Sequence, residues 1–314
     1  MMRHRQTYGT DTVHRWEGNP LIAISDLDFK CSDIRNAGAA EVNNEILLLI
    51  DIEHLSGHQS IHLAREQKNG RFAVAAEPFM SSSAEPRFAQ HEARGIMDPR
   101  ITFFDDVYYI MYVANGDHGF RLGLAKTKDF KSVERIGIIS EPDTKGGALF
   151  PAKIKGKYAR LERPREGNSI WVSYSDDLIY WGASDSVLSP RDGFWYLNRV
   201  SIGPPPIAIE DGWLLIYYGV KDTSSGPLYR LGAAIVDRED PTKILGRSNI
   251  PILAPREDYE RIGDTPNIVF STGAVVKEKG AIVIYYGAAD SCICMGTSTV
   301  EEIRYNCQNR RKAF

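Results

Sequence analysis

The sequence of 314 residues predicts an all-β fold, which we interpret as a five-bladed β-propeller. A turn followed by two β-rich runs recurs five times, roughly every 50–70 residues, the length of a four-stranded blade with its loops. Helical periodicity is scarce and is confined to residues 254–262 and the tail from Val300. A pair of β-sandwiches is the alternative, but five related hairpins divide poorly between two sandwiches.

Every copy of the repeat opens on Asn, Asp or Gly turn residues, or Lys-Gly, and continues into apolar or alternating β-formers. The copies begin at Asn43-Asn44, Asp105-Asp106, Gly156, Asp211-Gly212 and Lys279-Gly280. Their first runs span 45–50, 107–113, 157–162, 213–218 and 281–286, and their second runs span 60–65, 121–126, 169–173, 229–236 and 292–297. We therefore expect one propeller domain over residues 1–314, with an irregular segment at 1–16 and a C-terminal tail at 300–314.

Composition limits the classes of function. Hydrophobic residues make up 43% and charged residues 25%, which are ordinary globular values. The net charge of −3 provides no basic field for nucleic acid or an anionic membrane. Met1 to Arg15 lacks the apolar region of a signal peptide, and no run reaches membrane-spanning length. We expect a soluble, cytoplasmic protein with no nucleic-acid or membrane partner.

Cysteine and histidine spacing gives no convincing metal site. Cys292 and Cys294 share one face of an expected strand, but no matching Cys or His pair lies elsewhere, so buried free thiols are favoured. His54, His58 and His62 recur every four residues, which would suit a helical site, yet the β pattern separates them across a turn. We expect no metal and no cofactor.

Asp98 is the strongest candidate for a catalytic group. It precedes Pro99 and Arg100, just ahead of a strand-like run at 108–112. Pro99 should push Asp98 towards extended geometry and hold its carboxylate stiffly at the start of a strand. The plainer interpretation is an Asp-Pro turn with Arg100 as a surface ion-pair partner. Strand starts in a propeller face a central funnel, which favours the catalytic interpretation.

Other polar residues recur at the expected strand ends. Lys145 lies beside two glycines that would let a ligand approach the backbone. Glu162 and Arg163 end a strand, and Tyr218 and Asp290 stand in or beside two Tyr-Tyr-Gly turns. Each alone could be a surface charge or a packing aromatic. Together, carboxylates, cations and aromatics at blade edges are typical of a carbohydrate site, because rings stack on sugars and carboxylates bind hydroxyls.

The chain resembles glycoside hydrolase family 130, the β-mannoside phosphorylases and β-mannosidases, from about residue 17 to the end. The matching motifs are Asp98-Pro99-Arg100-Ile101-Thr102, Leu149-Phe150-Pro151 with Lys153-Ile154, Gly156-Lys157-Tyr158 leading to Arg163-Pro164, Gly203-Pro204-Pro205-Pro206-Ile207, Gly212-Trp213-Leu214-Leu215-Ile216-Tyr217, and Tyr285 to Asp290. The family fold is a five-bladed β-propeller, in agreement with the repeat count.

The resemblance implies inverting cleavage of a β-mannoside with Asp98 as the acid, acting through a sugar hydroxyl. In a phosphorylase, phosphate attacks the opposite face and replaces the second carboxylate of an inverting hydrolase. By the same resemblance Asn36, Arg100 and Asp290 would hold the mannosyl unit, with Tyr218 beside them. Lys145 and Arg163 would bind phosphate. The partners implied are a β-linked mannooligosaccharide or mannosyl disaccharide and inorganic phosphate; a homo-oligomer is left open.

Three departures from the family pattern leave the nucleophile open. Phosphorylases of the family usually carry an arginine where Asp51 stands, often a lysine at Ala208, and a histidine at Tyr218. Each lost charged hydrogen bond costs about 1.5–3 kcal/mol. Phosphorolysis, with help from Lys221 or Arg199, is ranked slightly first.

A β-mannosidase that uses water is the alternative, with Asp51 or Glu162 as its base. A carbohydrate-binding propeller without catalysis is the second alternative, although a binder has little need for a rigidly placed acid. The loops 117–120 and 192–196 are expected to shape the acceptor side because they carry aromatic residues. The linkage and the acceptor sugar are not encoded in any motif that we recognise.

Overall fold

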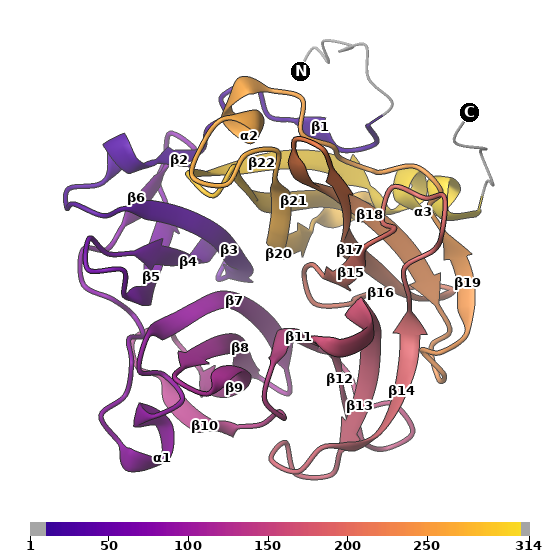
Figure 1. Cartoon of the computed structure of the whole chain (residues 1–314), viewed down its shortest axis with the longest axis horizontal. Helices are drawn as coiled ribbons and strands as arrows, with labels where there is room; N and C mark the ends of the chain where they lie inside the picture. The colour runs from indigo at the N-terminus through magenta and orange to yellow at the C-terminus, as the bar shows by residue number, and fades with distance from the viewer. Residues whose placement is uncertain (1–10, 309–314) are drawn as a thin grey trace.

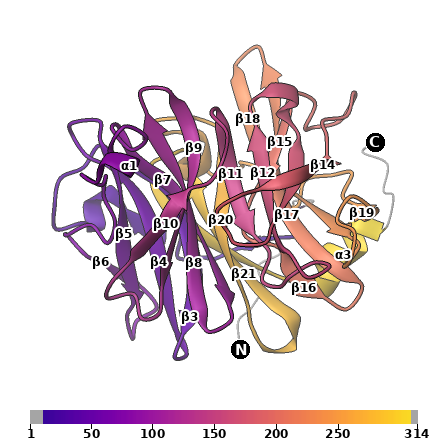
Figure 2. The same ribbon diagram turned by 90° about the horizontal axis from the view of Figure 1, so that it is seen from below.

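The computed structural model describes residues 11–308 and confirms an all-β fold. Within those residues the strands form four hydrogen-bonded sheets. Figure 1 shows them standing around a common centre, with β3, β7, β11, β15 and β20 nearest to it. In Figure 2, which is turned by 90° from Figure 1, the sheets stand side by side. The inner strands contact one another directly, β3 with both β7 and β20.

The largest sheet has eight strands in two antiparallel runs. The first run is β3 (Asp33–Val42), β4 (Glu45–Glu53), β5 (Gln59–Glu66) and β6 (Phe72–Val74); the second is β7 (Gly95–Phe104), β8 (Val107–Gly116), β9 (Gly119–Thr127) and β10 (Glu134–Ile138). A single parallel pair, Gln59 with Gly95, joins the two runs. The connection contains the short helix α1 (Pro86–Ala89).

The remaining three sheets follow in chain order. One holds β11 (Thr144–Leu149), β12 (Tyr158–Pro164), β13 (Ile170–Ser175) and β14 (Gly182–Leu188). The next holds β15 (Arg199–Ile202), β16 (Ile207–Ile209), β17 (Gly212–Thr223), β18 (Gly226–Val236) and β19 (Ile244–Arg247). The last holds β20 (Val269–Val276), β21 (Ala281–Ala288) and β22 (Cys292–Thr299), together with β1 (His14–Arg15) and β2 (Ile22–Ala23). Single-turn 3₁₀ segments lie at η1 (Ile24–Asp26), η2 (Glu166–Asn168) and η3 (Glu278–Gly280).

Turn chemistry explains where the hairpins reverse. Asn43 and Asn44 have φ values of 53° and 66°, and Asp105 and Asp106 have 49° and 57°. Asn and Asp tolerate this left-handed region, and two consecutive residues with positive φ match the twist of a tight hairpin. All five repeat copies predicted from sequence are antiparallel hairpins in the structure.

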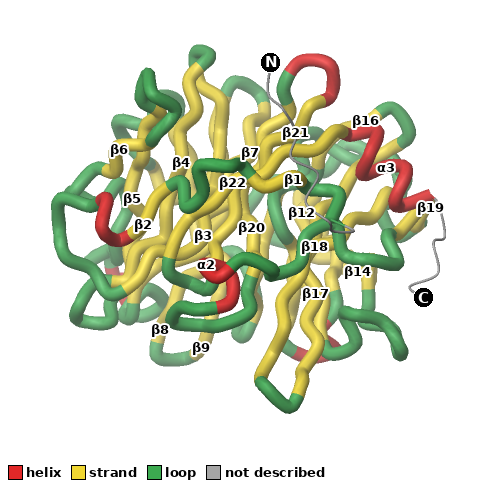
Figure 3. Tube along the Cα trace, turned by 90° about the horizontal axis from the view of Figure 1, so that it is seen from above, coloured by secondary structure: helices red, strands yellow, loops and turns green. Residues whose placement is uncertain are grey.

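Apolar side chains between neighbouring sheets form the core. The strand β4 reads Glu-Ile-Leu-Leu-Leu-Ile-Asp-Ile-Glu, and its residues from Ile46 to Ile52 are buried. Such a continuous apolar run is typical of a strand covered on both faces. The hairpin β17–β18 is the longest, and it extends beyond the neighbouring strands in Figures 2 and 3. It supplies one wall of the site described below.

The chain ends differ from the sequence expectation. His14 and Arg15 pair with Thr297 and Gly296, so the segment predicted to be irregular at 1–16 contains a strand that extends the last sheet. Residues 1–10 and 309–314 lie outside the described part. The helix α3 (Val300–Gln308) confirms the predicted helical tail, whereas the helix predicted over 254–262 shortens to α2 (Asp258–Arg261). None of the helices within residues 11–308 has the length and apolar character needed to cross a membrane.

Candidate active site

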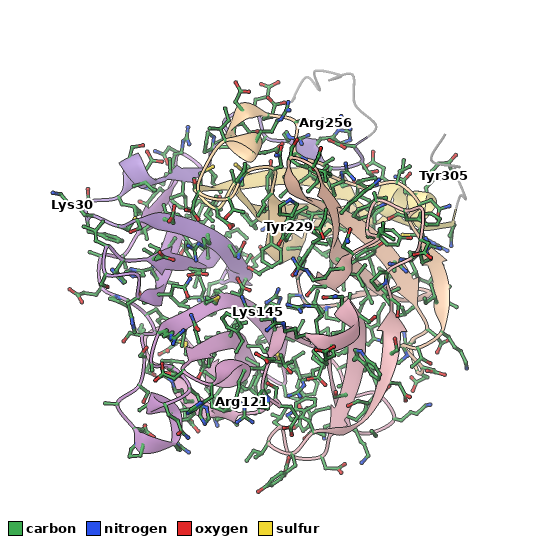
Figure 4. All side chains as sticks on the ribbon, in the orientation of Figure 1. Lys30, Arg121, Lys145, Tyr229, Arg256 and Tyr305 are labelled. Carbon is green, nitrogen blue, oxygen red and sulfur yellow. The ribbon has the colours of Figure 1, made fainter. Side chains whose placement is uncertain are left out.

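A polar cavity of about 510 Å³ opens where the inner strands begin. Its side chains come from the starts of β3, β7, β11 and β15 and from the ends of β4, β12 and β21, so distant parts of the chain meet there. The charged residues that line it are Arg35, Asp51, Asp98, Arg100, Asp143, Lys145, Arg163, Arg165, Arg199 and Asp290. Figure 4 shows Lys145 and Tyr229 near the centre of the molecule, far from the peripheral Lys30.

Asp98 lies in this cavity with its carboxylate fixed by a neighbour. The side-chain amide of Asn36 donates a hydrogen bond of 2.6 Å to Oδ1 of Asp98. Asn36 is buried, and its own Oδ1 has no partner among the described residues. A buried acceptor without a donor indicates room for a ligand hydroxyl.

The predicted backbone at Asp98 was wrong. Asp98 has φ 55° and lies inside β7, where the pairing with β8 shifts between Met97 and Arg100. Pro99 disfavours the right-handed helical region for the residue before it, and aspartate is one of the few residues that tolerate positive φ. The bulge therefore turns the Asp98 side chain towards the cavity instead of leaving it extended ahead of a strand.

Arg100 anchors the same bulge instead of pairing at the surface. Its guanidinium donates to the main-chain oxygens of Gly203 (2.7 Å), Ile202 (2.9 Å) and Asp98 (3.0 Å). The side chain is 1% exposed, which excludes the surface ion pair. These three carbonyls take three of the five guanidinium N–H donors, and Arg100 also lines the cavity, so its predicted contact with the mannosyl unit stays a prediction.

Asp51 is fully buried and faces Asp98. Its Oδ2 lies 3.4 Å from the main-chain N–H of Asp98, and its Oδ1 has no described partner. Burial, and then the charge of Asp98, raise the pKa of Asp51 well above its ordinary value, although Arg35 acts in the opposite direction. Asp51 pairs in register with Arg35 across β3 and β4. Burial therefore favours the neutral form of this carboxyl over the ionised form that a base requires.

Arg35 is a functional residue that the sequence reasoning missed. Its guanidinium lies 2.5 Å from Glu53 and 3.9 Å from Asp33 and Asp264. Burial opposes its charge, but Asp51, Glu53 and other nearby carboxylates raise the pKa of Arg35. Its position directly before Asn36 in sequence was the available signal. Arg35 makes one side of the cavity a cluster of carboxylates around a single guanidinium.

Asp290 belongs to this acidic side. It follows β21 with φ 51°. Burial raises the pKa of Asp290, and the charges of Asp98 and Asp264 act in the same direction, while Thr265 and Arg35 lower it. Its placement in the cavity with Asn36 and Asp98 agrees with the grouping predicted from sequence.

The opposite side of the cavity is basic. Lys145 and Arg163 are direct partners across β11 and β12. Lys145 Nζ lies 3.8 Å from the centre of the Phe120 ring, and Arg163 Nε donates to Ser201 Oγ over 3.3 Å. Neither residue has a carboxylate partner in the described part of the chain. Two adjacent unpaired cations are suited to an anion.

Arg199 and Arg165 extend the basic side, so the cavity holds two cations besides the pair that the sequence assigned to phosphate. Arg199 donates to the Tyr229 hydroxyl over 2.6 Å, and Arg165 lies at the rim. Arg165 was missed; it lies just after the end of β12, so strand alternation from Arg163 does not place it. Lys221, the other suggested helper, lines a separate cleft beside the β17–β18 hairpin.

Tyr218 packs in an aromatic corner next to these cations. Its ring stacks on Tyr229 at 5.7 Å and meets Phe270 edge-on at 4.6 Å. Burial by itself would raise the pKa of Tyr218, but Arg163 and Arg199 outweigh burial and lower it. A phenol in this state is a strong hydrogen-bond donor towards an anion or a sugar oxygen.

Two sequence predictions about the surroundings were wrong. Glu162 does not line the cavity: it neighbours Arg163 on β12 and therefore points to the other face, where it binds Arg160 at 2.7 Å and accepts a short hydrogen bond from Ser173. The loop 192–196 borders the same outer cleft as Lys221. From the loop 117–120, Phe120 does reach the cavity.

The cysteines and histidines behave as structural residues. All four cysteines are free and buried, and the Sγ atoms of Cys292 and Cys294 lie 3.9 Å apart on one face of β22. His54 and His62 share contacts with Ser60, and His58 contacts Ser82. Within residues 11–308, no cluster of three or more His, Cys, Asp or Glu side chains is arranged to hold a metal ion.

Comparison with known proteins identifies the family of the chain. The family model of glycoside hydrolase family 130, described as beta-1,4-mannooligosaccharide phosphorylase, matches residues 35–309. A 1,2-beta-oligomannan phosphorylase of Thermoanaerobacter sp. (strain X514) is 40% identical over 73% of this chain and 75% of its own. A beta-1,4-mannooligosaccharide phosphorylase of Ruminococcus albus is 28% identical over 93% of this chain and 90% of its own.

A solved structure shows the same fold. The beta-1,2-mannobiose phosphorylase from Listeria innocua, in complex with beta-1,2-mannobiose, superposes with a TM-score of 0.84 at 30% identity, covering 94% of this chain and 99% of its own. The family match covers most of the chain and most of each relative. The chain therefore belongs to glycoside hydrolase family 130.

Proposed function

We propose that the protein cleaves β-mannosidic linkages of mannooligosaccharides by inverting phosphorolysis and releases mannose 1-phosphate. One observation carries the proposal: a carboxylate held by Asn36 faces, across a single cavity, a group of cations that lack carboxylate partners. A single acid and an anion-binding wall are what a glycosidic displacement by phosphate requires. The printed names of the relatives support the same reaction.

Each side of the cavity has a role in this reaction. Asp98 supplies the proton that leaves with the glycosidic oxygen, directly or through a sugar hydroxyl. Phosphate, bound by Lys145 and Arg163, attacks the anomeric carbon from the opposite face; the carbon–oxygen bond to the leaving sugar breaks as the bond to phosphate forms. Asn36, Asp290 and Tyr218 bind the mannosyl unit. Arg100 holds the Asp98 bulge through main-chain carbonyls.

The chemistry uses inorganic phosphate as co-substrate and calls for no cofactor. We propose β-1,2-linked mannosides as the first substrates to assay, because a 1,2-beta-oligomannan phosphorylase is 40% identical to this chain. Four buried free thiols suit a reducing compartment, which supports a cytoplasmic location.

We also propose that residues 1–314 form one five-bladed propeller domain. The eight-stranded sheet counts as two blades, because a single parallel pair connects its two antiparallel runs. The last blade takes β1 and β2 from the start of the chain, which closes the ring.

Hydrolysis by water is the second candidate, and one observation favours it. Asp51 is fully buried beside Asp98 and has an unpartnered oxygen, where a water molecule could be held. We rank hydrolysis below phosphorolysis, because Lys145 and Arg163 are adjacent and have no carboxylate partner in the described part of the chain.

Variants of the basic wall test the proposal. Lys145→Gln and Arg163→Gln should each raise the KM for phosphate at least about ten-fold, because each removes a charged hydrogen bond. The KM for the mannoside should change much less. Equal effects on both substrates, or no effect on the phosphate KM, would contradict phosphate binding at this pair.

A further inference from the structure

We propose that Arg165 and Arg199 form an outer anion site, which receives phosphate at the mouth of the cavity before it reaches Lys145 and Arg163. The inference rests on the proposed function, in which phosphate is the co-substrate. Its ligand is inorganic phosphate on the way in and the phosphate group of the sugar phosphate on the way out.

Lys145 and Arg163 form the inner level of the basic wall, which two contacts define. Lys145 and Arg163 are register partners on β11 and β12, so their side chains leave adjacent backbone positions. Arg163 also reaches β15, where its Nε donates to Ser201 Oγ over 3.3 Å. This level therefore spans three neighbouring strands.

The outer level lies two residues away along the chain, at the start of β15 and just after the end of β12. Arg165 follows Arg163 by two positions, and Arg199 precedes Ser201 by two. Since residues i and i+2 of a strand share a face, Arg199 points to the same side as Ser201, about 6–7 Å further along β15. Arg165 lies just beyond the end of β12, where the chain enters η2. The turn η2 contacts both β12 and β15 and keeps the two strand ends together. Both arginines line the cavity.

The outer arginines have unused donors. Arg165 is exposed and forms no hydrogen bond or ion pair through its guanidinium with any residue that the structure describes. Arg199 binds the Tyr229 hydroxyl at 2.6 Å, but its Nε is buried and has no acceptor in residues 11–308. A buried N–H without a protein acceptor is available to the oxygen of a water molecule or of a ligand.

Neighbouring carboxylates do not neutralise this level. Asp143 pairs with Arg165 only through the backbone, where the Arg165 N–H donates to the Asp143 carbonyl over 2.9 Å. The Asp143 carboxylate instead faces the turn at Gly119. Of the other carboxylates that line the cavity, Asp51 and Asp290 act on Arg35, and Asp98 is held by Asn36.

This arrangement creates a graded path for an anion. The acidic side repels phosphate, while two successive levels of cations attract it along the β12–β15 wall. A charged cleft with low-dielectric walls focuses the field and raises the on-rate of an oppositely charged ligand by roughly 10- to 1,000-fold, and salt weakens this effect. The outer level therefore acts on capture of phosphate more than on the bond-breaking step.

The test is the salt dependence of phosphate capture. Initial rates are measured with saturating β-1,2-mannobiose and varied phosphate, at low and high sodium chloride, for wild type, Arg165→Gln, Arg165→Lys and the remote control Lys30→Gln. We expect Arg165→Gln to lower kcat/KM for phosphate roughly ten-fold at low salt and to flatten its salt dependence. Arg165→Lys should restore both, and Lys30→Gln should match wild type.

The outcomes separate this inference from the proposed function. If wild type shows no phosphate dependence at all, the proposed function fails and the outer site fails with it. If wild type depends on phosphate but Arg165→Gln keeps the wild-type kcat/KM and salt slope, the outer site alone is refuted. An Arg165→Gln defect that is equal at low and high salt, or that Arg165→Lys does not restore, also refutes it.

Discussion

The side-chain amide of Asn36 donates a 2.6 Å hydrogen bond to Oδ1 of Asp98, and so links β3 to the bulge of β7. The amide fixes one carboxylate oxygen and leaves the other free to face the cavity. Since β3 and β7 belong to different antiparallel runs, the geometry of the acid depends on how the two runs pack. The predictions below follow from this dependence and from the charges around it.

Asp98→Asn should retain the fold and sugar binding but lose about 10²- to 10⁴-fold in kcat, the usual contribution of a general acid. Asparagine tolerates the φ of 55° that this position requires, so the bulge should persist. Steady-state rates and calorimetric binding of mannobiose measure the two effects. Unchanged turnover would remove Asp98 from the mechanism.

Asp51→Asn should gain stability relative to wild type as pH rises. Burial and the Asp98 charge raise the pKa of Asp51 above its ordinary 3.8, so the folded protein holds this proton more tightly than the unfolded chain. The contribution of Asp51 is therefore fully present below the ordinary pKa and is lost as pH rises through the folded value. Asparagine cannot ionise and suffers no such loss.

Urea midpoints at acidic and mildly alkaline pH measure the Asp51 effect. The exposed Asp192→Asn is the control and should track wild type at both pH values. A difference between Asp51→Asn and wild type that does not grow with pH would show that Asp51 is not held protonated. The same variant also tests hydrolysis, because asparagine cannot act as a base. If Asp51 activates water, Asp51→Asn should abolish the activity.

Gly38→Ala should damage both stability and activity. An added Cβ would lie 2.6 Å from the carbonyl oxygen of Pro99, which is backbone and cannot swing aside. Such overpacking costs about 1–3 kcal/mol and would displace the residue that follows Asp98. Melting temperature and kcat should both fall, whereas Gly137→Ala, whose Cβ would meet only Ile139 at 3.7 Å, should be close to neutral. A neutral Gly38→Ala would mean that β3 does not constrain the bulge.

Glu260→Gln should destabilise the contact between β1, which contains Arg15, and α2, which contains Glu260. Glu260 is fully buried and accepts from Arg15 at 2.7 and 2.8 Å and from Tyr286 at 3.0 Å. Removing one charge of a buried pair costs about 3–5 kcal/mol when the partner charge is left uncompensated. Arg15 keeps a second carboxylate, Asp11 at 2.9 Å, so we expect a cost near the lower end of that range. The exposed pair Glu85–Arg87 is the control, and Glu85→Gln should change the free energy of unfolding by less than about 1 kcal/mol. Equal effects of the two variants would contradict a structural role for the Glu260 pair.

The hairpins could be predicted from sequence because their signals are local. Asn43-Asn44 and Asp105-Asp106 encode tight turns, and the apolar runs beside them encode strands. The bulge at Asp98 could not be predicted from sequence, because it depends on pairing with β8 and on the contact with Gly38.

Within the site, the sequence identified residues that carry a motif and missed those defined only by packing. Asn36, Asp98, Lys145, Arg163 and Asp290 do meet in one cavity. Arg35 and Arg165 lie within two residues of recognised ones, but only the folded structure shows that they line the cavity. Glu162 was assigned to the wrong face. Neighbouring residues of β12 point to opposite faces, so Glu162 points away from the cavity once Arg163 points into it.

The most direct test of the account is the product formed from β-1,2-mannobiose in the presence of inorganic phosphate, followed by phosphorus and proton magnetic resonance. Inverting phosphorolysis of a β-mannoside predicts α-mannose 1-phosphate, formed in step with one free mannose and only when phosphate is present. Release of two free mannose units at a rate that ignores phosphate would contradict the account and would assign the reaction to water.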